Sequence, residues 1–199
     1  MRNVLWGAAA ALLMVSSSNA DQRSWYVSLE AGMSDLGGGG DYVDVSTPPF
    51  VMYFPIGDLD ESITPIGTIG AYLGDWRVEA EFALRSGDYY STQVDQTTAM
   101  LNVAYDIGVV DHLSLTLGAG VGADFISLET PVADGDTISL AYQGLVGLSY
   151  ELTDSTDITL TYRYFDTLDV EISEATPLGF ASLGSADDRT ISLGLRFAL

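Results

Sequence analysis

Hydrophobic and polar residues alternate with a period of two along most of the chain after residue 24, in runs separated by turn residues. Successive side chains of a β-strand point to opposite faces, so this period indicates strands with one apolar and one polar face. Helical spacing is rare between the runs. We expect eight strands, over residues 25–34, 63–73, 77–85, 98–107, 113–125, 138–152, 158–165 and 190–199.

The connections between these runs alternate in length. Short turns are expected at residues 74–76, 108–112 and 153–157, and long loops at 35–62, 86–97, 127–137 and 166–189. An even number of strands also brings both termini to the short-turn side. Short turns on one side and long loops on the other are typical of outer-membrane barrels. The pattern therefore predicts an all-β fold, an eight-stranded antiparallel up-and-down β-barrel.

Alternation alone does not say which face lies inside, because a soluble lipocalin-type barrel alternates too. Here the polar face is also the small face, since it carries Gly118, Gly120 and Gly122, and a barrel of eight strands has only enough interior for side chains. Aromatic residues on the apolar face gather near the strand ends, as interfacial girdles do. They are Trp25, Tyr105, Tyr150 and Phe197 toward the short turns, and Phe125, Tyr142 and Tyr164 toward the long loops. We therefore expect a transmembrane barrel with its apolar face toward lipid.

The first twenty residues are expected to be a cleaved signal peptide, followed by one barrel domain over residues 21–199. Arg2 precedes an apolar stretch over 4–15, and Ser18 and Ala20 are small residues where a signal peptidase reads the chain. Lys is absent and charged residues make up only 18% of the chain, which is low for a surface that faces water. The net charge of −21 excludes nucleic-acid binding, and the lack of Cys excludes thiolate chemistry.

Charged residues on the polar face point into the predicted lumen. They are Glu30, Arg77, Glu79, Glu81, Arg85, Asp106, Asp124, Glu151, Arg163 and Arg196. Buried charges must pair, because their desolvation is otherwise uncompensated. We expect a ladder of Arg–carboxylate pairs that plugs the lumen and fixes the strand register. The alternative is a narrow, passive, porin-like pore.

The chain resembles the small OmpA-like, opacity-protein-like outer-membrane β-barrels in its residues 25–27, 77–82 and 158–164. Its end matches the polar–x–Gly–x–x–aromatic–x–hydrophobic signal of that family, with Ser192, Gly194, Phe197 and Leu199 in the four places. Leu199 stands where Phe is usual. The resemblance implies a monomer in the cell outer membrane of a Gram-negative envelope, in contact with lipid and lipopolysaccharide and inserted by the barrel-assembly machinery.

Catalytic and metal chemistry find little support. Barrel enzymes use His with Ser and an acid, or Asp–His pairs, whereas the single His, His112, falls in a short turn. Asp58, Asp60 and Glu61, or Asp134 and Asp136, are candidate Ca²⁺ ligands, but neither group has the spacing of an EF-hand. We therefore predict no enzyme activity, no cofactor and no metal site.

The long loops carry most of the acidic residues, which predicts an anionic outer surface suited to cations or basic partners. The first long loop also holds an apolar run, Pro48, Pro49, Phe50, Met52, Tyr53 and Phe54. This run is a candidate contact for an unknown extracellular partner. The predicted role is structural or surface-interacting, in adhesion or envelope integrity.

Overall fold

The computed structural model describes residues 25–37, 42–47, 50–55, 62–89, 92–129, 134–168, 175–176, 179–180 and 187–199. The signal peptide expected at residues 1–20 lies outside these ranges. Among the described residues, no helix is long and apolar enough to cross a bilayer.

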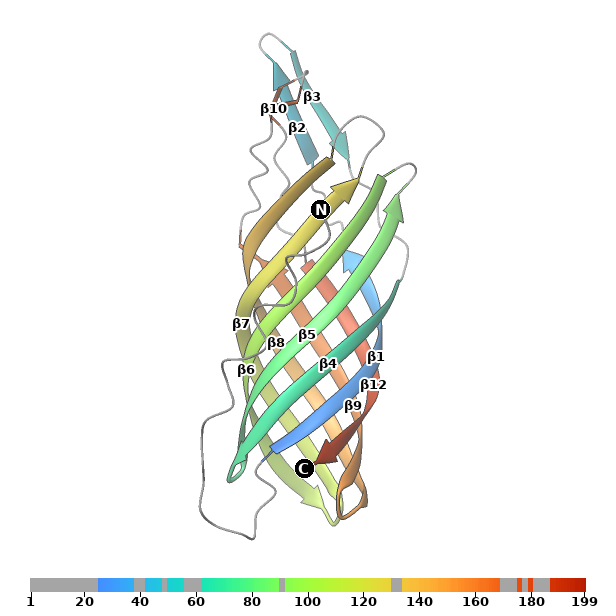
Figure 1. The fold of residues 1–199 in the computed structure, drawn as a ribbon, viewed down its shortest axis with the longest axis vertical. Coiled ribbons are helices and arrows are strands. Elements are labelled where there is room, and N and C mark those ends of the chain that lie inside the picture. The colour runs from blue at the N-terminus through green and yellow to red at the C-terminus, as the bar shows by residue number, and fades with distance from the viewer. Residues whose placement is uncertain are drawn as a thin grey trace.

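Eight antiparallel strands form a closed barrel in the order β1-β12-β9-β8-β7-β6-β5-β4 (Figure 1). Their bounds are β1 Trp25–Gly37, β4 Ser62–Leu73, β5 Trp76–Tyr89, β6 Thr92–Val110, β7 Leu113–Glu129, β8 Asp134–Thr153, β9 Thr156–Thr167 and β12 Asp187–Ala198. The first and last strands pair with each other, as in the register Tyr26↔Ala198, so the sheet has no open edge at this seam. The predicted eight-stranded antiparallel barrel is confirmed.

The two faces of each strand differ as the alternation predicts. In β9, Thr159 and Arg163 point inward and are buried, whereas Leu160 and Tyr162 point outward and are exposed. The outward face is apolar around the whole barrel; Leu29, Val121 and Leu193, on three different strands, are each at least 60% exposed. Lipid is the solvent that favours such a surface.

Several strands run further toward the long-loop side than predicted. β5 continues to Tyr89 and β6 begins at Thr92, so most of the loop expected at 86–97 is strand. β7 and β8 likewise extend into the loop expected at 127–137. Outward-facing residues there, such as Ser86 and Asp95, are polar and exposed, so the apolar–polar alternation that marks a strand in lipid stops before the strand does.

A second, four-stranded sheet with the order β10-β11-β2-β3 was not predicted. Its strands are β2 Tyr42–Thr47, β3 Phe50–Pro55, β10 Ala175–Thr176 and β11 Gly179–Phe180, within the loops expected at 35–62 and 166–189. Figure 1 places β2, β3 and β10 at the long-loop end. β3 is apolar at nearly every position and β10 and β11 have two residues each, so none of the three carries a two-residue period.

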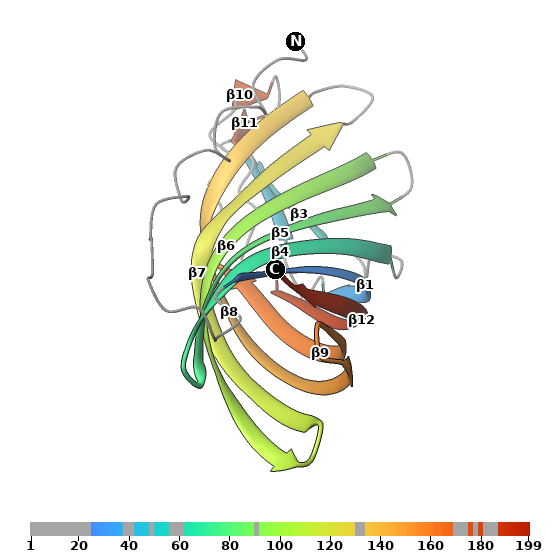
Figure 2. The same ribbon diagram turned by 60° about the horizontal axis from the view of Figure 1, so that its bottom comes forward.

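The turns at the opposite end are tight. Each has two residues, 74–75, 111–112 and 154–155, and the flanking residues that we expected in the turns belong to strands. Gly74 and His112 have positive φ angles of 69° and 67°, the left-handed conformation found in the favoured two-residue hairpin turns. Figure 2 brings this end of the barrel forward.

Candidate functional site in the barrel lumen

Inward-facing charges gather at three heights in the lumen, and the lower cluster lies nearest the short turns. Arg77 Nε lies 3.3 Å from Glu79 Oε1, and Arg77 Nη1 lies 3.4 Å from Asp106 Oδ2. Tyr26 donates a hydrogen bond from its hydroxyl to Glu79. The guanidinium of Arg196 lies over the Tyr26 ring, 5.1 Å from its centroid. Two guanidinium groups and the Glu79 carboxylate thus surround the buried Tyr26 side chain.

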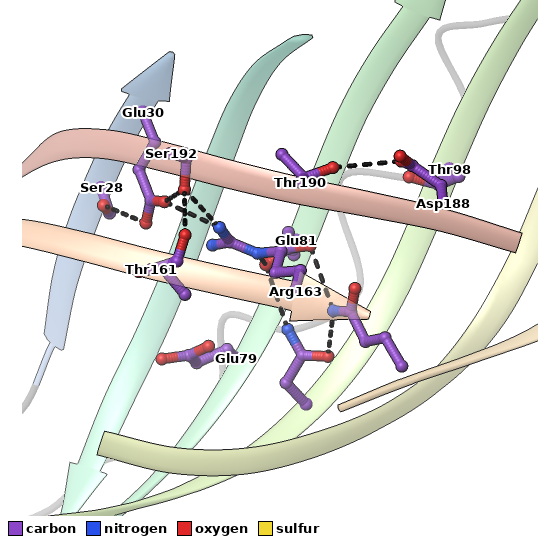
Figure 3. Close-up of polar contacts among 12 residues, drawn as sticks. Ser28, Glu30, Glu79, Glu81, Thr98, Thr161, Arg163, Asp188, Thr190 and Ser192 are labelled. Atoms are coloured by element: carbon purple, nitrogen blue, oxygen red, sulfur yellow. Dashed lines mark hydrogen bonds and ion pairs between the residues drawn. The ribbon is translucent and has the colours of Figure 1, made fainter. Parts of the chain in front are cut away.

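The middle cluster is centred on Arg163 (Figure 3). Its Nη1 lies 2.9 Å from Glu30 Oε2 and its Nε lies 3.2 Å from Glu81 Oε2. Arg163 Nη1 also donates to Ser192 Oγ at 2.6 Å. Three further hydrogen bonds complete the cluster: Asn102 to Glu81, Gln143 to Glu81, and Gln143 to Asn102. β1, β5, β6, β8, β9 and β12 therefore meet across the lumen through side chains.

The upper cluster lies nearest the long loops. Arg85 Nε forms an ion pair with Asp188, and both side chains are about 1% exposed. Arg85 Nη1 donates to Thr98 at 3.1 Å. Asp124 accepts a hydrogen bond of 3.1 Å from Gln96. This cluster links β5 to β12, across two intervening strands.

The structure brings nine of the ten predicted lumen charges into these three clusters. Glu151 is the exception. It lies at the short-turn end, where its carboxylate is 3.3 Å from His112 Nδ1 and both side chains are more than a third exposed. A register shift between Glu151 and Thr153 turns this end of β8 away from the regular alternation, which explains the difference.

Two acidic members of the clusters were missed by the sequence analysis. Asp188 is 1% exposed and Asp157 lies 3.7 Å from Arg196. Both lie on the inward face. Asp188 comes two residues before the expected start of its strand, and Asp157 comes one residue before the start of its own. Extending the alternation by two residues would have found them. The amides Gln96, Asn102 and Gln143 and the hydroxyl of Tyr26 were also overlooked as lumen partners.

Glycines let several of these side chains lie flat across the lumen. A Cβ on Gly120 would meet the Asn102 amide, and one on Gly70 would overlap the Tyr26 ring. The backbone of Gly194 similarly leaves room for Glu30. Glycines on the inward face thus make space for long polar side chains from neighbouring strands.

A small cavity separates the lower and middle clusters. Its volume is about 20 Å³, and Tyr26, Glu30, Arg77, Arg163 and Arg196 are among its lining residues. A cavity of this size has room for roughly one water molecule.

The other predicted sites lie elsewhere. Phe50, Met52, Tyr53 and Phe54 belong to β3, while Pro48, Pro49 and the acidic group at 58–61 lie outside the described residues. In the assembly signal, Ser192 points into the lumen, Phe197 is 37% exposed on the outer face, and the Leu199 amide donates to the Trp25 carbonyl at 2.9 Å. The described residues contain no group of three or more His, Cys, Asp or Glu side chains placed to hold a metal ion.

Comparison with known proteins agrees with the barrel. The chain is 37% identical to Major surface antigen 4 of Anaplasma marginale over 70 residues, which are 33% of this chain and 23% of that protein. The match thus spans about a quarter of the length of that relative.

Solved structures with a similar fold are bacterial barrels of low sequence identity. Neisserial surface protein A has a TM-score of 0.63 and 18% identity, over 88% of this chain and 97% of that chain. Outer membrane protein AlkL has a TM-score of 0.60 and 20% identity, over 94% of both chains. OprG of Pseudomonas aeruginosa has a TM-score of 0.56 and 14% identity, over 88% of this chain and 97% of that chain.

The family described as "Outer membrane protein beta-barrel domain" matches residues 7–197, nearly the whole chain. A barrel with an apolar outer wall and a charged interior is the fold that such a family requires. This chain is an outer-membrane β-barrel protein and belongs to that family.

Proposed function

We propose that this protein is a closed outer-membrane scaffold that acts at the cell surface, in adhesion or in envelope integrity. The observation that carries the proposal is the set of buried Arg–carboxylate ion pairs across the lumen. Arg77, Arg85 and Arg163 are at most 3% exposed, and each is bound to carboxylates from other strands or its own. A barrel whose interior is cross-linked in this way has a rigid wall and leaves its loops as the variable part.

Surface placement of the function is supported by three features. Most of the acidic residues of the chain lie in or beside the connections on the long-loop side. A second sheet stands at the same end of the molecule (Figure 1). Two of the similar proteins are named for the surface, Major surface antigen 4 and Neisserial surface protein A. We propose that the loops and the second sheet contact an extracellular partner, with the run at 48–54 as the contact.

A non-enzymatic role is part of this proposal. His112 lies in a two-residue turn at the end opposite the long loops, and its side chain is 62% exposed beside Glu151. A general base needs hydrogen-bond reach to a substrate held in place, and a lone exposed imidazole in a turn offers none. We also propose a monomer that contacts lipid and lipopolysaccharide and is inserted by the barrel-assembly machinery through residues 192–199.

The surface role is tested by deleting residues 48–54 and measuring the binding of barrel-expressing cells to host cells and matrix proteins. We expect binding to fall while the amount of heat-modifiable barrel in the outer membrane stays the same. Deleting residues 181–186 is the matched control. Unchanged binding after the first deletion contradicts a contact at 48–54.

The closed lumen is tested by liposome swelling with the refolded wild-type protein. A closed scaffold leaves vesicles in isotonic arabinose at constant turbidity, as in protein-free vesicles. Swelling at a rate that rises with protein content would instead support the porin-like pore.

A further inference from the structure

The inward side of the strands carries a level that is not polar. On β6 the inward residues run Thr98, Met100, Asn102, and on β9 they run Arg163, Phe165, Thr167. The same polar–apolar–polar order occurs on β4, β5 and β8, with Ile66, Ala83 and Ala141 as the apolar members. Each apolar residue is therefore flanked by polar residues two positions away on both sides.

These apolar positions lie at one height around the barrel. Ile66 pairs with Ala83, Met100 pairs with Gly122, and Gly122 pairs with Ala141. The strands of a barrel are tilted, so residues at the same height are shifted in register between some neighbouring strands. When this shift is applied through β9, β12 and β1, the level returns to Ile66. We name this level the apolar ring; its members are Gly32, Ile66, Ala83, Met100, Gly122, Ala141, Phe165 and Thr190.

Three members of the ring pack together. Met100, Ala141 and Phe165 contact one another and are 2%, 4% and 1% exposed. Gly122 lets Met100 lie across the lumen, because a Cβ there would stand 2.6 Å from its sulfur. Thr190 is the one polar member, and its hydroxyl is bonded to Ser34 and Asp188 on the upper side.

The levels on both sides of the ring are polar throughout or nearly so. Above it, Arg85 lies over the Phe165 ring at 4.9 Å and pairs with Asp188. Below it lies the middle cluster, with Arg163 (Figure 3) and with Gln143, which donates to Asn102. Water and ions that reach either cluster therefore meet a layer with no free polar group to replace their hydration, and narrow apolar constrictions exclude them by dewetting.

We propose that the apolar ring, and not the ion-pair clusters, is the permeability barrier of this barrel. The proposal rests on the closed lumen proposed above and identifies the residues that close it. The clusters fix the strand register and stiffen the barrel. Met100 and Phe165 are the two largest side chains in the packed part of the ring, and they block the passage of water and ions.

The test is current recording in planar lipid bilayers at physiological salt, with variants refolded and shown to be barrels by heat-shifted gel mobility. The wild type is expected to give no current steps. Met100→Ala with Phe165→Ala removes the two largest members and is expected to give discrete steps. Met100→Leu with Phe165→Leu keeps the level apolar and filled and is expected to remain silent.

Glu81→Ala with Gln143→Ala is the control for the clusters, because it removes two side chains of the middle cluster one level below the ring while Arg163 keeps Glu30 as its partner. It is expected to remain silent. Met100→Gln, which is nearly the same size but polar, serves if the double alanine variant does not fold, and is expected to conduct where Met100→Leu does not.

The two proposals fail in different ways. Steps from the wild type contradict the closed lumen itself, and with it the ring. A silent wild type with silent ring variants, or with a conducting Glu81→Ala and Gln143→Ala variant, overturns the ring as the barrier and leaves the closed scaffold standing.

Discussion

Replacing Arg163 by Met removes the centre of the middle cluster and should strongly destabilise the barrel. Arg163 lies 2.9 Å from Glu30 and 3.2 Å from Glu81, and all three side chains are at most 5% exposed. Removing one partner of a buried ion pair costs about 3–5 kcal/mol, because the remaining charge is left uncompensated. Here two carboxylates lose their counter-charge, so we expect a loss at the upper end of that range.

The assay is urea unfolding in lipid vesicles, followed by tryptophan fluorescence and by gel mobility without heating. Arg189→Met is the matched control. Its side chain is 60% exposed and its ion pair with Asp187 is 3.8 Å long, so the same change there should cost roughly 0–1 kcal/mol.

A rescue distinguishes charge from volume. Adding Glu30→Gln and Glu81→Gln to the Arg163→Met variant removes the two orphaned charges and should restore most of the lost stability. If Arg163→Met costs no more than Arg189→Met, or if the rescue has no effect, the ion pairs do not stabilise this lumen and the reasoning is refuted.

Two further predictions use the same unfolding assay. Gly122→Ala should lower the free energy of unfolding by about 1–3 kcal/mol, because its Cβ would lie 2.8 Å from Met100 Cα. Gly144→Ala, with open space around it, should leave that free energy nearly unchanged. Equal losses from the two variants would contradict the packing described. Val121→Arg, near the middle of β7 and 67% exposed, should lower the free energy of unfolding by roughly 2–4 kcal/mol. Val110→Arg, beside a short turn, should lower it by roughly 0–1 kcal/mol. A loss that does not depend on position would mean that the outer wall does not face lipid as described.

The sequence predicted the barrel because lipid and lumen make opposite demands on alternate residues. Where that contrast exists, as in β7 from Leu113 to Phe125, the strand, its phase and its inward glycines all follow from the pattern. Where strands leave the bilayer, the outward residues become polar, as Ser86 and Asp95 do, and the contrast ends. That is why the upper parts of β5 to β8 and the inward position of Asp188 were not predicted.

The apolar ring was hidden for the opposite reason. In β4, the apolar Ile66 points inward and the small Gly67 points outward. This is the reverse of the apolar-outward, small-inward pattern of the other strands, and it makes β4 the least regular strand in the sequence. Phe165, read as the end of a strand, has the same effect in β9. From the sequence alone, an inward apolar residue such as Phe165 only interrupts the alternation. The strand register is needed to show that it lies beside Ala141 and Met100.

Current recording on the wild-type protein, refolded into a planar bilayer at physiological salt, tests the central claim of a closed barrel most directly. The proposed closed lumen predicts a flat baseline, with no more events than a protein-free membrane under the same voltage. Reproducible unitary steps from heat-modifiable, folded wild-type protein would contradict it.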